Sequence, residues 1–494
     1  MDGSVLTLAI AELLLLTVVT TGLLWWYRSP DYTPPWVSLV VLATWLLGFS
    51  GTLLLPLDIA QALSDEHKSP GMSATWNMVY WSTFVLAWLV LPVLYEAWYA
   101  GDLTWSARVL SALKVNLISY LAMAIMGAIF CIWLLLSSEM TFGALGTFGM
   151  VFGNTYGLLL VIALLGNGLV EVPRAVWRYR DGSKEIQFIQ LRAVMVDTDC
   201  YDCQCELDDA VASVHSMSRK VRSLPDSGSL RKHMDRILDT CDAQGGLDGS
   251  SLPLTSADTV RGRYGGASPH HSRSRARSTD AGAEIVCDDP SPSSLAAVAR
   301  RLKMAQEVVH ASQQRWVSLV LEYERALKRT RRPASSSHSP SEPASSSSSP
   351  SEPASSDRAK RGGLVARLSN GLRRSWVKSG LAQPCLALVS AVCTGLSVIC
   401  VWSELTMGSP VSLSPWGLLI SSLASDDGTG AHTVSIQLIA LIPYCYMSLC
   451  TFYSLFKLKL FGLLRLSGPH QSTPGPLIFN AIYLSRLQFP LGYN

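Results

Sequence analysis

Long apolar segments occur in two groups, one toward each end of the chain, and roughly two hundred mostly polar residues separate them. Each segment runs for about twenty residues, which is the length that an α-helix needs to cross the hydrocarbon of a bilayer. The pattern therefore predicts an all-α protein: a polytopic transmembrane helix bundle that lies in a lipid bilayer and carries a large insert outside the membrane.

The first membrane region, residues 1–178, is predicted to contain five spans. Tryptophan and tyrosine cluster at the ends of the segments, where such amphipathic rings lie at the level of the lipid headgroups. The N-terminus has no basic residues before its apolar run, so we expect a retained span in place of a cleaved signal peptide. The five spans are approximately Ser4–Tyr27, Trp36–Leu57, Met78–Tyr99, Leu113–Leu136 and Phe148–Val172.

The second membrane region, residues 384–494, is predicted to contain three to four spans. Pro384–Trp402 and Val434–Phe456 are long enough to cross a membrane. Segment 412–424 is apolar over only about thirteen residues, which suits either a short span or a re-entrant hairpin. The final run, Leu477–Asn494, carries Arg486 and ends with the sequence, so it predicts a truncated or a short last span.

Lysine and arginine near the span ends predict the side of each loop, because basic residues concentrate in cytoplasmic loops. They flank the polar insert, residues 179–383, on both sides, so we expect a cytoplasmic insert and an exterior N-terminus. One loop conflicts with this charge rule under one of the two alternatives. It contains Lys457, Lys459 and Arg465, and it lies outside if segment 412–424 crosses the membrane but inside if that segment is re-entrant. We expect a plasma membrane location, with the endolysosomal and endoplasmic reticulum membranes as alternatives.

Two helices are predicted in the insert, near 185–224 and near 294–328. In the second, apolar residues recur at alternating steps of three and four, the spacing of a coiled-coil seam. The first has weaker spacing and is suited to pair with the second as an antiparallel hairpin. Residues 227–292 and 331–362 are predicted to be disordered, because they offer few apolar side chains to bury. The candidate seam residues are Leu295, Val298, Leu302, Val309, Trp316, Leu319 and Tyr323.

Composition excludes few functions. The net charge of +3 gives no reason to expect a nucleic-acid partner. The loops predicted to lie outside contain no cysteine, so no extracellular disulfide framework is expected. The sequence has no glycine-rich phosphate loop, no Gly-x-Ser-x-Gly and no His-Glu-x-x-His. We therefore expect no catalytic residues and a protein that is not an enzyme.

Three cysteines of the insert, Cys200, Cys203 and Cys205, form a Cys-x-x-Cys-x-Cys cluster. A tetrahedral zinc site needs a fourth ligand. Cys241 or a histidine is a candidate, but no second Cys-x-x-Cys occurs. Reduced thiols or acylation next to the membrane explain the cluster better than metal binding, so no metal and no cofactor are expected.

Polar residues within the apolar segments form the candidate intramembrane polar site. They are Glu12, Asn167, Glu171 and Glu404. A charge at the bilayer centre costs at least about 2.5 kcal/mol on insertion scales, so such residues indicate function by default. Glu12 lies roughly two turns inside the first span and is the strongest candidate for a buried polar contact or a cation site. Glu171 and Glu404 lie near span ends, where interfacial solvation is the simpler explanation.

Four motifs mark the predicted spans: Leu53–Asp58, Val79–Ser82, Gly153–Leu158 and Gly168–Arg174. Taken in this order they resemble the LMBR-like family of multi-pass membrane proteins. That family includes limb-region protein, the lipocalin-interacting membrane receptor and a lysosomal cobalamin-export protein. Two further motifs, Val401–Glu404 and Leu230–Leu238, look most like the longer branch, that of the second limb-region-domain-containing proteins.

The resemblance implies nine spans, an exterior N-terminus, a cytoplasmic coiled coil and a link to signalling by G-protein-coupled receptors. If there are nine spans, segment 412–424 must be one of them. The loop with Lys457, Lys459 and Arg465 then lies outside, which conflicts with the charge rule. The chain departs from the family in its serine–proline repeat, from Ser339 and Ser349, and in lacking the family's long cytoplasmic tail after Asn494. Partners that bind that tail are therefore not expected here.

Two functions remain open. The first is a receptor-like or scaffold protein whose seam recruits cytoplasmic partners or a second copy, giving a homo-oligomer. The second is a transporter or transport accessory for a small molecule or ligand-carrier complex, with a polar cavity near Glu12 and helix breaks such as Pro92. An inward-facing pocket lined by Glu12 and Asn167 favours transport, whereas a bundle packed solid through its middle favours the scaffold.

Overall fold

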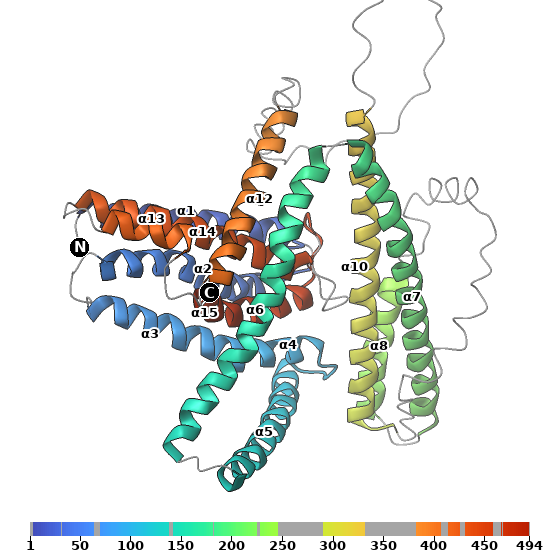
Figure 1. The fold of residues 1–494 in the computed structure, drawn as a ribbon. Coiled ribbons are helices and arrows are strands. Elements are labelled where there is room, and N and C mark those ends of the chain that lie inside the picture. Colours follow the sequence, from blue (N-terminus) through green and yellow to red (C-terminus); the bar gives the residue numbers. More distant parts are fainter. Residues whose placement is uncertain are drawn as a thin grey trace, which may run out of the picture.

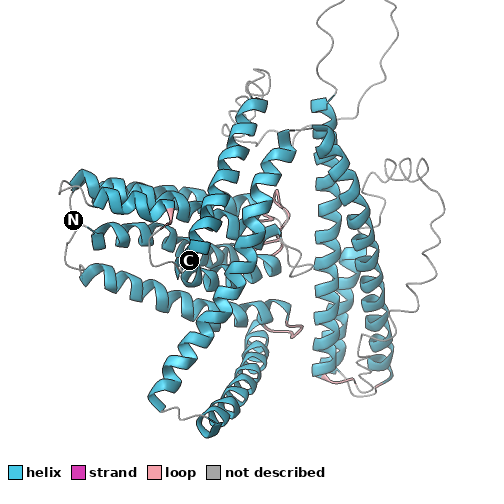
Figure 2. Cartoon of the chain, in the orientation of Figure 1, coloured by secondary structure: helices cyan, strands magenta, loops and turns pink. Residues whose placement is uncertain are grey.

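A computed structural model describes most of the chain. Within the described residues the protein is helical, and the only bridge between extended residues joins Arg28 to Ser472 (Figure 2). The prediction of an all-α membrane bundle is therefore confirmed. The described ranges are 3–30, 32–63, 70–137, 142–180, 182–224, 228–245, 290–330, 382–406, 413–424, 430–457, 466 and 468–493.

The first membrane region forms five long helical stretches. One of them changes its winding partway, because α3 continues through a short π-helix, η1, into α4. The elements are α1 Gly3–Tyr27, α2 Pro35–Leu63, α3 Pro70–Val85, η1 Leu86–Val90, α4 Leu91–Tyr99, α5 Trp105–Ser137 and α6 Phe142–Arg180.

The second membrane region and the insert are also helical. The second membrane region contains α12 Ala382–Thr406, α13 Pro415–Ala424, α14 Gly430–Lys457 and α15 Pro474–Tyr493. The insert contains α7 Gly182–Ser223, α8 Gly228–Gly245 and α10 Pro292–Thr330. These three helices pack together across one end of the membrane bundle, called the insert end below (Figure 1).

Helix α8 corrects one prediction. Residues 228–245 lie inside the segment 227–292 that was predicted to be disordered, yet they form a helix. The reason is that Met234, Ile237 and Cys241 bury one side of α8 against α7 and α10. Most of the remainder of that segment, and all of 331–362, lies outside the described residues.

Seven helical stretches among the described residues are long and apolar enough to cross a membrane. They comprise all five stretches of the first region together with α12 and α14. Helix α13 has ten residues, which is about 15 Å and half the thickness of the hydrocarbon. Helix α15 is not among the seven and carries Arg486. The count of nine spans remains a prediction.

Helix directions bear on the assignment of segment 412–424. Helix α12 begins at the insert end, where Ser390 Oγ donates to the Pro173 carbonyl at 3.1 Å near the end of α6. Helix α14 finishes at the same end, with the Phe456 ring 5.7 Å from that of Tyr27, the last residue of α1. If α12 and α14 each cross once, α13 adds no net crossing. These directions favour the re-entrant alternative, and the assignment of 412–424 stays a prediction.

This arrangement also removes the charge conflict. Lys457, at the end of α14, lies at the insert end, on the same side as the basic residues that end α6. Helix α15 starts there too, because the turn before it contacts the end of α1. In that turn the Ser472 N–H donates to the Tyr27 carbonyl at 2.9 Å and the His470 N–H to the Trp26 carbonyl at 2.7 Å.

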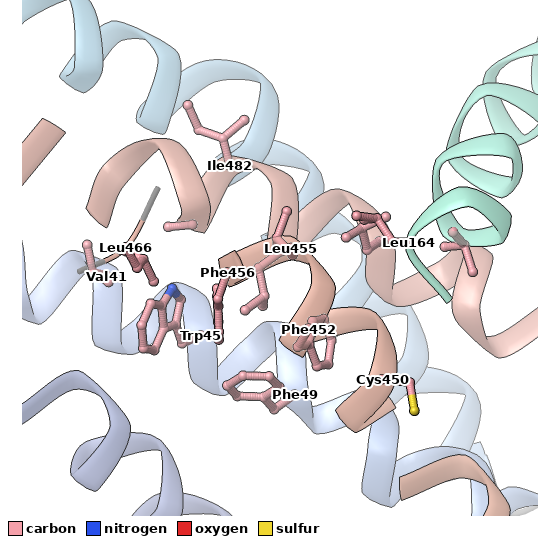
Figure 3. Close-up of a cluster of buried hydrophobic side chains, with 14 of the residues drawn as sticks. Val41, Trp45, Phe49, Leu164, Cys450, Phe452, Leu455, Phe456, Leu466 and Ile482 are labelled. Carbon is pink, nitrogen blue, oxygen red and sulfur yellow. The ribbon is translucent and has the colours of Figure 1, made fainter. Parts of the chain in front are cut away.

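An aromatic cluster fills the half of the bundle nearer the insert end (Figure 3). The rings of Trp45 and Phe456 stack with their centroids 5.6 Å apart, and Phe49 meets Phe452 edge to face at 4.8 Å. These side chains come from α2 and α14, and Leu164 of α6 packs into the same cluster. Helices α2, α6, α14 and α15 thus share one buried core.

A glycine allows the closest of these contacts. A Cβ atom on Gly168 of α6 would overlap the backbone of Cys450 in α14, whereas a Cβ on Gly166 would meet nothing within 4 Å. We predict that Gly168→Ala destabilises the protein by about 1–3 kcal/mol through overpacking. Gly166→Ala should be neutral or stabilising by up to about 1 kcal/mol, since alanine favours helix. Thermal unfolding of the purified full chain in detergent measures both, and equal effects would contradict the packing.

Candidate functional site

The predicted seam of α10 packs against α7 of the same chain. Leu295, Leu302 and Ala305 lie in one buried cluster with Val214 and Val221 of α7. The pairing is antiparallel, because the other end of the seam packs against the beginning of α7.

That second cluster joins Leu319 and Trp316 of α10 to Ile189 and Val196 of α7. Burial of apolar side chains at about 25 cal/mol per Å² drives such pairing. The seam is therefore occupied within the chain, so this face of α10 does not have to recruit a partner or a second copy. Partner contacts must use other faces of the insert.

Glu307 of α10 is the centre of contact between the insert and the membrane bundle. Its carboxylate accepts a hydrogen bond from Trp98 Nε1 at 2.7 Å and another from the Tyr99 hydroxyl at 2.8 Å, both at the end of α4. Thr473, the residue before α15, places its hydroxyl 3.5 Å from the same carboxylate. An anion at the start of a helix is also favoured by the helix dipole. One side chain of the insert thus joins two membrane stretches.

The contact around Glu307 between α10, the end of α4 and the start of α15 is called the junction below. Two cations of α10 extend it. Arg300 pairs with Glu96 of α4 at 2.6 Å. Lys303 donates to the carbonyl of Trp98 and lies 4.0 Å from the centre of its ring. Burial lowers the pKa of Lys303 to about 8, partly opposed by the nearby carboxylate of Glu307. A cation held over an aromatic face with a carbonyl acceptor is a specific contact, because the ring quadrupole attracts positive charge.

Two glycines let the elements approach this closely. A Cβ on Gly475 of α15 would overlap the hydroxyl of Tyr99, and one on Gly101, after α4, would overlap the carbonyl of Ala296 in α10. Helix α8 adds a contact to the same loop, with His233 Nε2 at 3.0 Å from the carbonyl of Gly101. Close backbone contacts at Gly475 and Gly101 therefore shape the junction together with its charged side chains.

Next to the junction, the third span changes its winding at Pro92. Proline has no N–H to donate, so it interrupts the helical ladder. The turn before it forms the π-helix η1, in which the Leu91 N–H donates to the Leu86 carbonyl five residues earlier. This change leaves backbone carbonyls of η1 without their usual donors.

Neighbouring helices supply those donors. The Ala87 carbonyl accepts a hydrogen bond from Arg486 of α15 at 3.2 Å, and the Trp88 carbonyl accepts one from the Tyr120 hydroxyl of α5. Arg486 also lies 4.2 Å from the centre of the Trp88 ring. Side chains of adjacent helices commonly satisfy backbone groups freed by proline inside membranes. The break therefore ties α5 and α15 to the third span.

A cavity of about 200 Å³ lies beside this break. It is large enough for a few water molecules. One wall is Glu96, the partner of Arg300, so the cavity adjoins the junction. Neither Glu12 nor Asn167 lines it. The lining residues are Pro92, Tyr95, Glu96, Asn116, Phe479, Ile482, Tyr483 and Arg486.

The structure places the four predicted intramembrane polar residues in separate environments. Glu12 is 8% exposed and accepts a hydrogen bond at 3.0 Å from Gln437 of α14, which is fully buried. Asn167 of α6 donates to the hydroxyl of Ser454 at 3.2 Å. Each of these residues joins α14 to a different helix, so they act as separate interhelical contacts.

The other two lie near helix ends. Glu171 pairs with Arg174 at 3.0 Å and with Arg178 at 2.8 Å, close to the end of α6. Glu404 is exposed near the end of α12, which is the opposite end of the bundle. The four residues do not form one site.

The cysteine cluster of the insert is divided between the two sides of α7. Cys203 is buried against α10, whereas Cys205 is exposed. Burial raises the pKa of the Cys203 thiol to about 11 and also raises that of Cys200, while hydrogen bonding from Ser312 opposes both shifts. In the parts of the chain that the structure describes, no three metal-binding side chains converge. Of the three thiols, that of Cys203 is the one packed in the interface with α10.

Sequence reasoning missed Glu307, Lys303 and Arg300. They lie on α10 outside the heptad seam, where charged residues usually indicate a solvated face. A usable signal was present, since they recur at steps of three and four and form a charged stripe of their own. The aromatic pair that they contact was assigned only to the membrane interface.

Fold and junction together define a class: a polytopic helical membrane protein with a helical insert docked on one end of its bundle. The chain belongs to the family of LMBR1-like membrane proteins, whose pattern matches residues 5–494. No solved structure matches the chain.

Three relatives illustrate the similarity. The LMBR1 domain-containing protein 2 homolog of Drosophila melanogaster is 24% identical, over 93% of this chain and 65% of its own length. Homolog B of Dictyostelium discoideum is 27% identical, over 100% and 59%. The G-protein coupled receptor-associated protein LMBRD2 of Homo sapiens is 23% identical, over 86% and 55%. The chain thus spans less than two thirds of the length of these relatives.

The junction predicts the effect of removing its anion. Glu307→Gln should weaken docking by about 1.5–3 kcal/mol, because it replaces a charged acceptor of two hydrogen bonds by a neutral one. Hydrogen–deuterium exchange should then increase in the loop after α4 and at the start of α15. Glu322→Gln, on the same helix and 3.9 Å from its nearest basic partner Arg192, is the matched control. Unchanged exchange in the Glu307 variant would disprove the role of this carboxylate.

Lys303 predicts a dependence on pH. Its pKa is about 8 when docked, against about 10.4 for an exposed lysine, so the docked state holds fewer protons between these values. Docking should therefore strengthen as pH rises from about 8 to about 10. The Lys303→Met variant has no charge at this position, so its stability does not gain from the loss of a proton. The melting temperature of the variant minus that of the natural protein should therefore be highest at pH 7 and should fall as pH rises. A difference that is constant with pH would contradict the shift.

Proposed function

We propose that this protein is a non-enzymatic, receptor-associated scaffold in signalling by G-protein-coupled receptors. The human relative named above is called a G-protein coupled receptor-associated protein, and 86% of this chain aligns with it. This chain belongs to the LMBR1-like family over nearly its whole length. The single observation that carries the proposal is the junction at Glu307, because it fixes an otherwise solvent-exposed helical unit at one end of a membrane bundle.

In the proposed orientation the insert end is cytoplasmic and the N-terminus is exterior. Basic residues support this, since Arg178 and Arg180 end α6, and Lys457 ends α14, all at that end. The insert then lies where a receptor presents its cytoplasmic loops. A rigid unit held at that level recruits partners at less entropic cost than a flexible linker, because its orientation is set in advance.

Transport has weaker support. The half of the described bundle nearer the insert end is filled by the aromatic cluster around Trp45 and Phe452, which leaves no described opening there toward the cytoplasmic side. The cavity next to Pro92 lies to one side, at the level of the junction, and is lined by neither Glu12 nor Asn167. These features favour a bundle that anchors the insert over one that moves a ligand through its middle.

The proposal predicts co-purification with receptors. The tagged full chain, expressed with a panel of G-protein-coupled receptors, should retain at least one receptor above the level of an unrelated multi-pass protein. Gly475→Ala, which forces Tyr99 away from its contact, should reduce that recovery several-fold. Gly395→Ala, whose added Cβ meets nothing within 4 Å, should not.

Enrichment of no receptor would overturn the association. Equal recovery with both glycine variants would leave the association intact and overturn the role of the docked insert. Expression and thermal stability of both variants are measured alongside, so that loss of folding is distinguished from loss of docking.

A further inference from the structure

Helix α7 exposes large apolar side chains on the side that faces away from α10. They fall on one side of the helix, at successive steps of three, three, one and six, and are between 44% and 70% exposed. The opposite side of the same turns is buried, with Ile189 and Val196 packed against α10. The apolar half of the outer face consists of Phe188, Leu191, Val194, Met195 and Tyr201.

The same side of α7 then becomes acidic. Asp202, Glu206 and Asp209 recur at steps of four and three and are exposed. None of them forms an ion pair with a lysine or arginine among the described residues. The outer face of α7 therefore has an apolar half, followed toward the C-terminus by an acidic half.

The arrangement of the helices turns this face toward the cytoplasmic solvent. Helix α10 lies between the membrane bundle and α7 (Figure 1), and its Glu307 and Lys303 point to the bundle while Leu302 packs against α7. Helix α7 also begins at Gly182, directly after α6. The bundle meets the beginning of this face, where Arg178 of α6 lies 4.4 Å from the centre of the Phe188 ring. The rest of the apolar half, from Leu191 to Tyr201, is between 58% and 70% exposed and is held near the membrane.

Charge complementarity selects the occupant. The fitting ligand is an amphipathic helix that carries leucine-like side chains on one side and lysine or arginine on the other. Membrane proteins carry basic segments of this kind beside their spans, on the cytoplasmic side. The acidic half repels anionic headgroups. A second copy of α7 carries Lys184 and Lys220 in line with Asp202, but both lie outside the apolar and acidic halves, so its own acidic half would meet no basic stretch of matching length.

We propose that the outer face of α7 binds a basic amphipathic juxtamembrane segment of a partner membrane protein. The proposal rests on the proposed function and names the surface that would carry it out. The apolar half supplies burial, which gives affinity, and the acidic half sets the direction in which the partner helix lies.

A crosslinking experiment tests this surface on the full chain in nanodiscs of neutral lipid. A benzophenone residue replaces Leu191, and in a second protein it replaces Leu321 of α10, which is 43% exposed. The probe is a labelled helical peptide of leucine and lysine, about 18 residues or five turns long. Its counterpart has glutamate in place of lysine.

The basic peptide should crosslink at position 191 and not at 321, and the acidic peptide should crosslink at neither. Asp202→Lys with Asp209→Lys should reduce crosslinking at 191 at least about tenfold. Asp235→Lys with Asp239→Lys makes the same charge change on exposed residues of α8 and should leave it unchanged. Unchanged thermal stability of both double variants confirms that they are folded.

Equal crosslinking at 191 and 321, or full retention in the Asp202 and Asp209 variant, would overturn the proposed surface. So would crosslinking of position 191 to lipid alone. Receptor co-purification is scored separately with the same double variants. If a receptor is still recovered at full yield with the α7 variant, the proposed function stands and this surface fails. If the peptide crosslinks as expected and no receptor co-purifies, the surface stands and the receptor association fails.

Discussion

The hydrogen bonds from Trp98 and Tyr99 to Glu307 hold the two halves of this architecture together. A partly buried carboxylate is costly unless donors replace its water. Here the donors are aromatic side chains at the end of a span, the position where tryptophan and tyrosine anchor helices in the headgroup region. The same rings that set the depth of the third span therefore also bind the insert. The placement of the whole insert depends on this contact, because the contact orients α10 and α10 in turn orients α7.

Several polar groups within the bundle follow a related rule, because they are paired with a partner on another helix. Glu12 meets Gln437, Asn167 meets Ser454, and the carbonyls freed by Pro92 are met by side chains of α5 and α15. Unsatisfied polar groups are expensive in lipid, so each pair also specifies which helices are neighbours. Distributed pairs of this kind favour a bundle that serves as an anchor.

The insert shows how far a periodic pattern can be trusted. The heptad spacing predicted helices over the ranges that α7 and α10 occupy, since apolar residues at steps of three and four form a stripe on one side. It could not distinguish pairing within the chain from pairing between chains, because both bury the same stripe. Helix α8 escaped prediction because three buried side chains, Met234, Ile237 and Cys241, are too few to stand out from a polar background.

The amino-acid pattern alone was enough to assign the class of the protein, because lipid as a solvent demands long apolar helices, and their length and composition are readable without a structure. It also placed aromatic rings and basic residues at the helix ends. The directions in which α12 and α14 run, and the contact of Glu307 with residues more than two hundred positions away, are seen only in the packed structure. Those outcomes depend on helix directions and on close backbone contacts at Gly475 and Gly101, which arise when all the helices pack together and which no local pattern encodes.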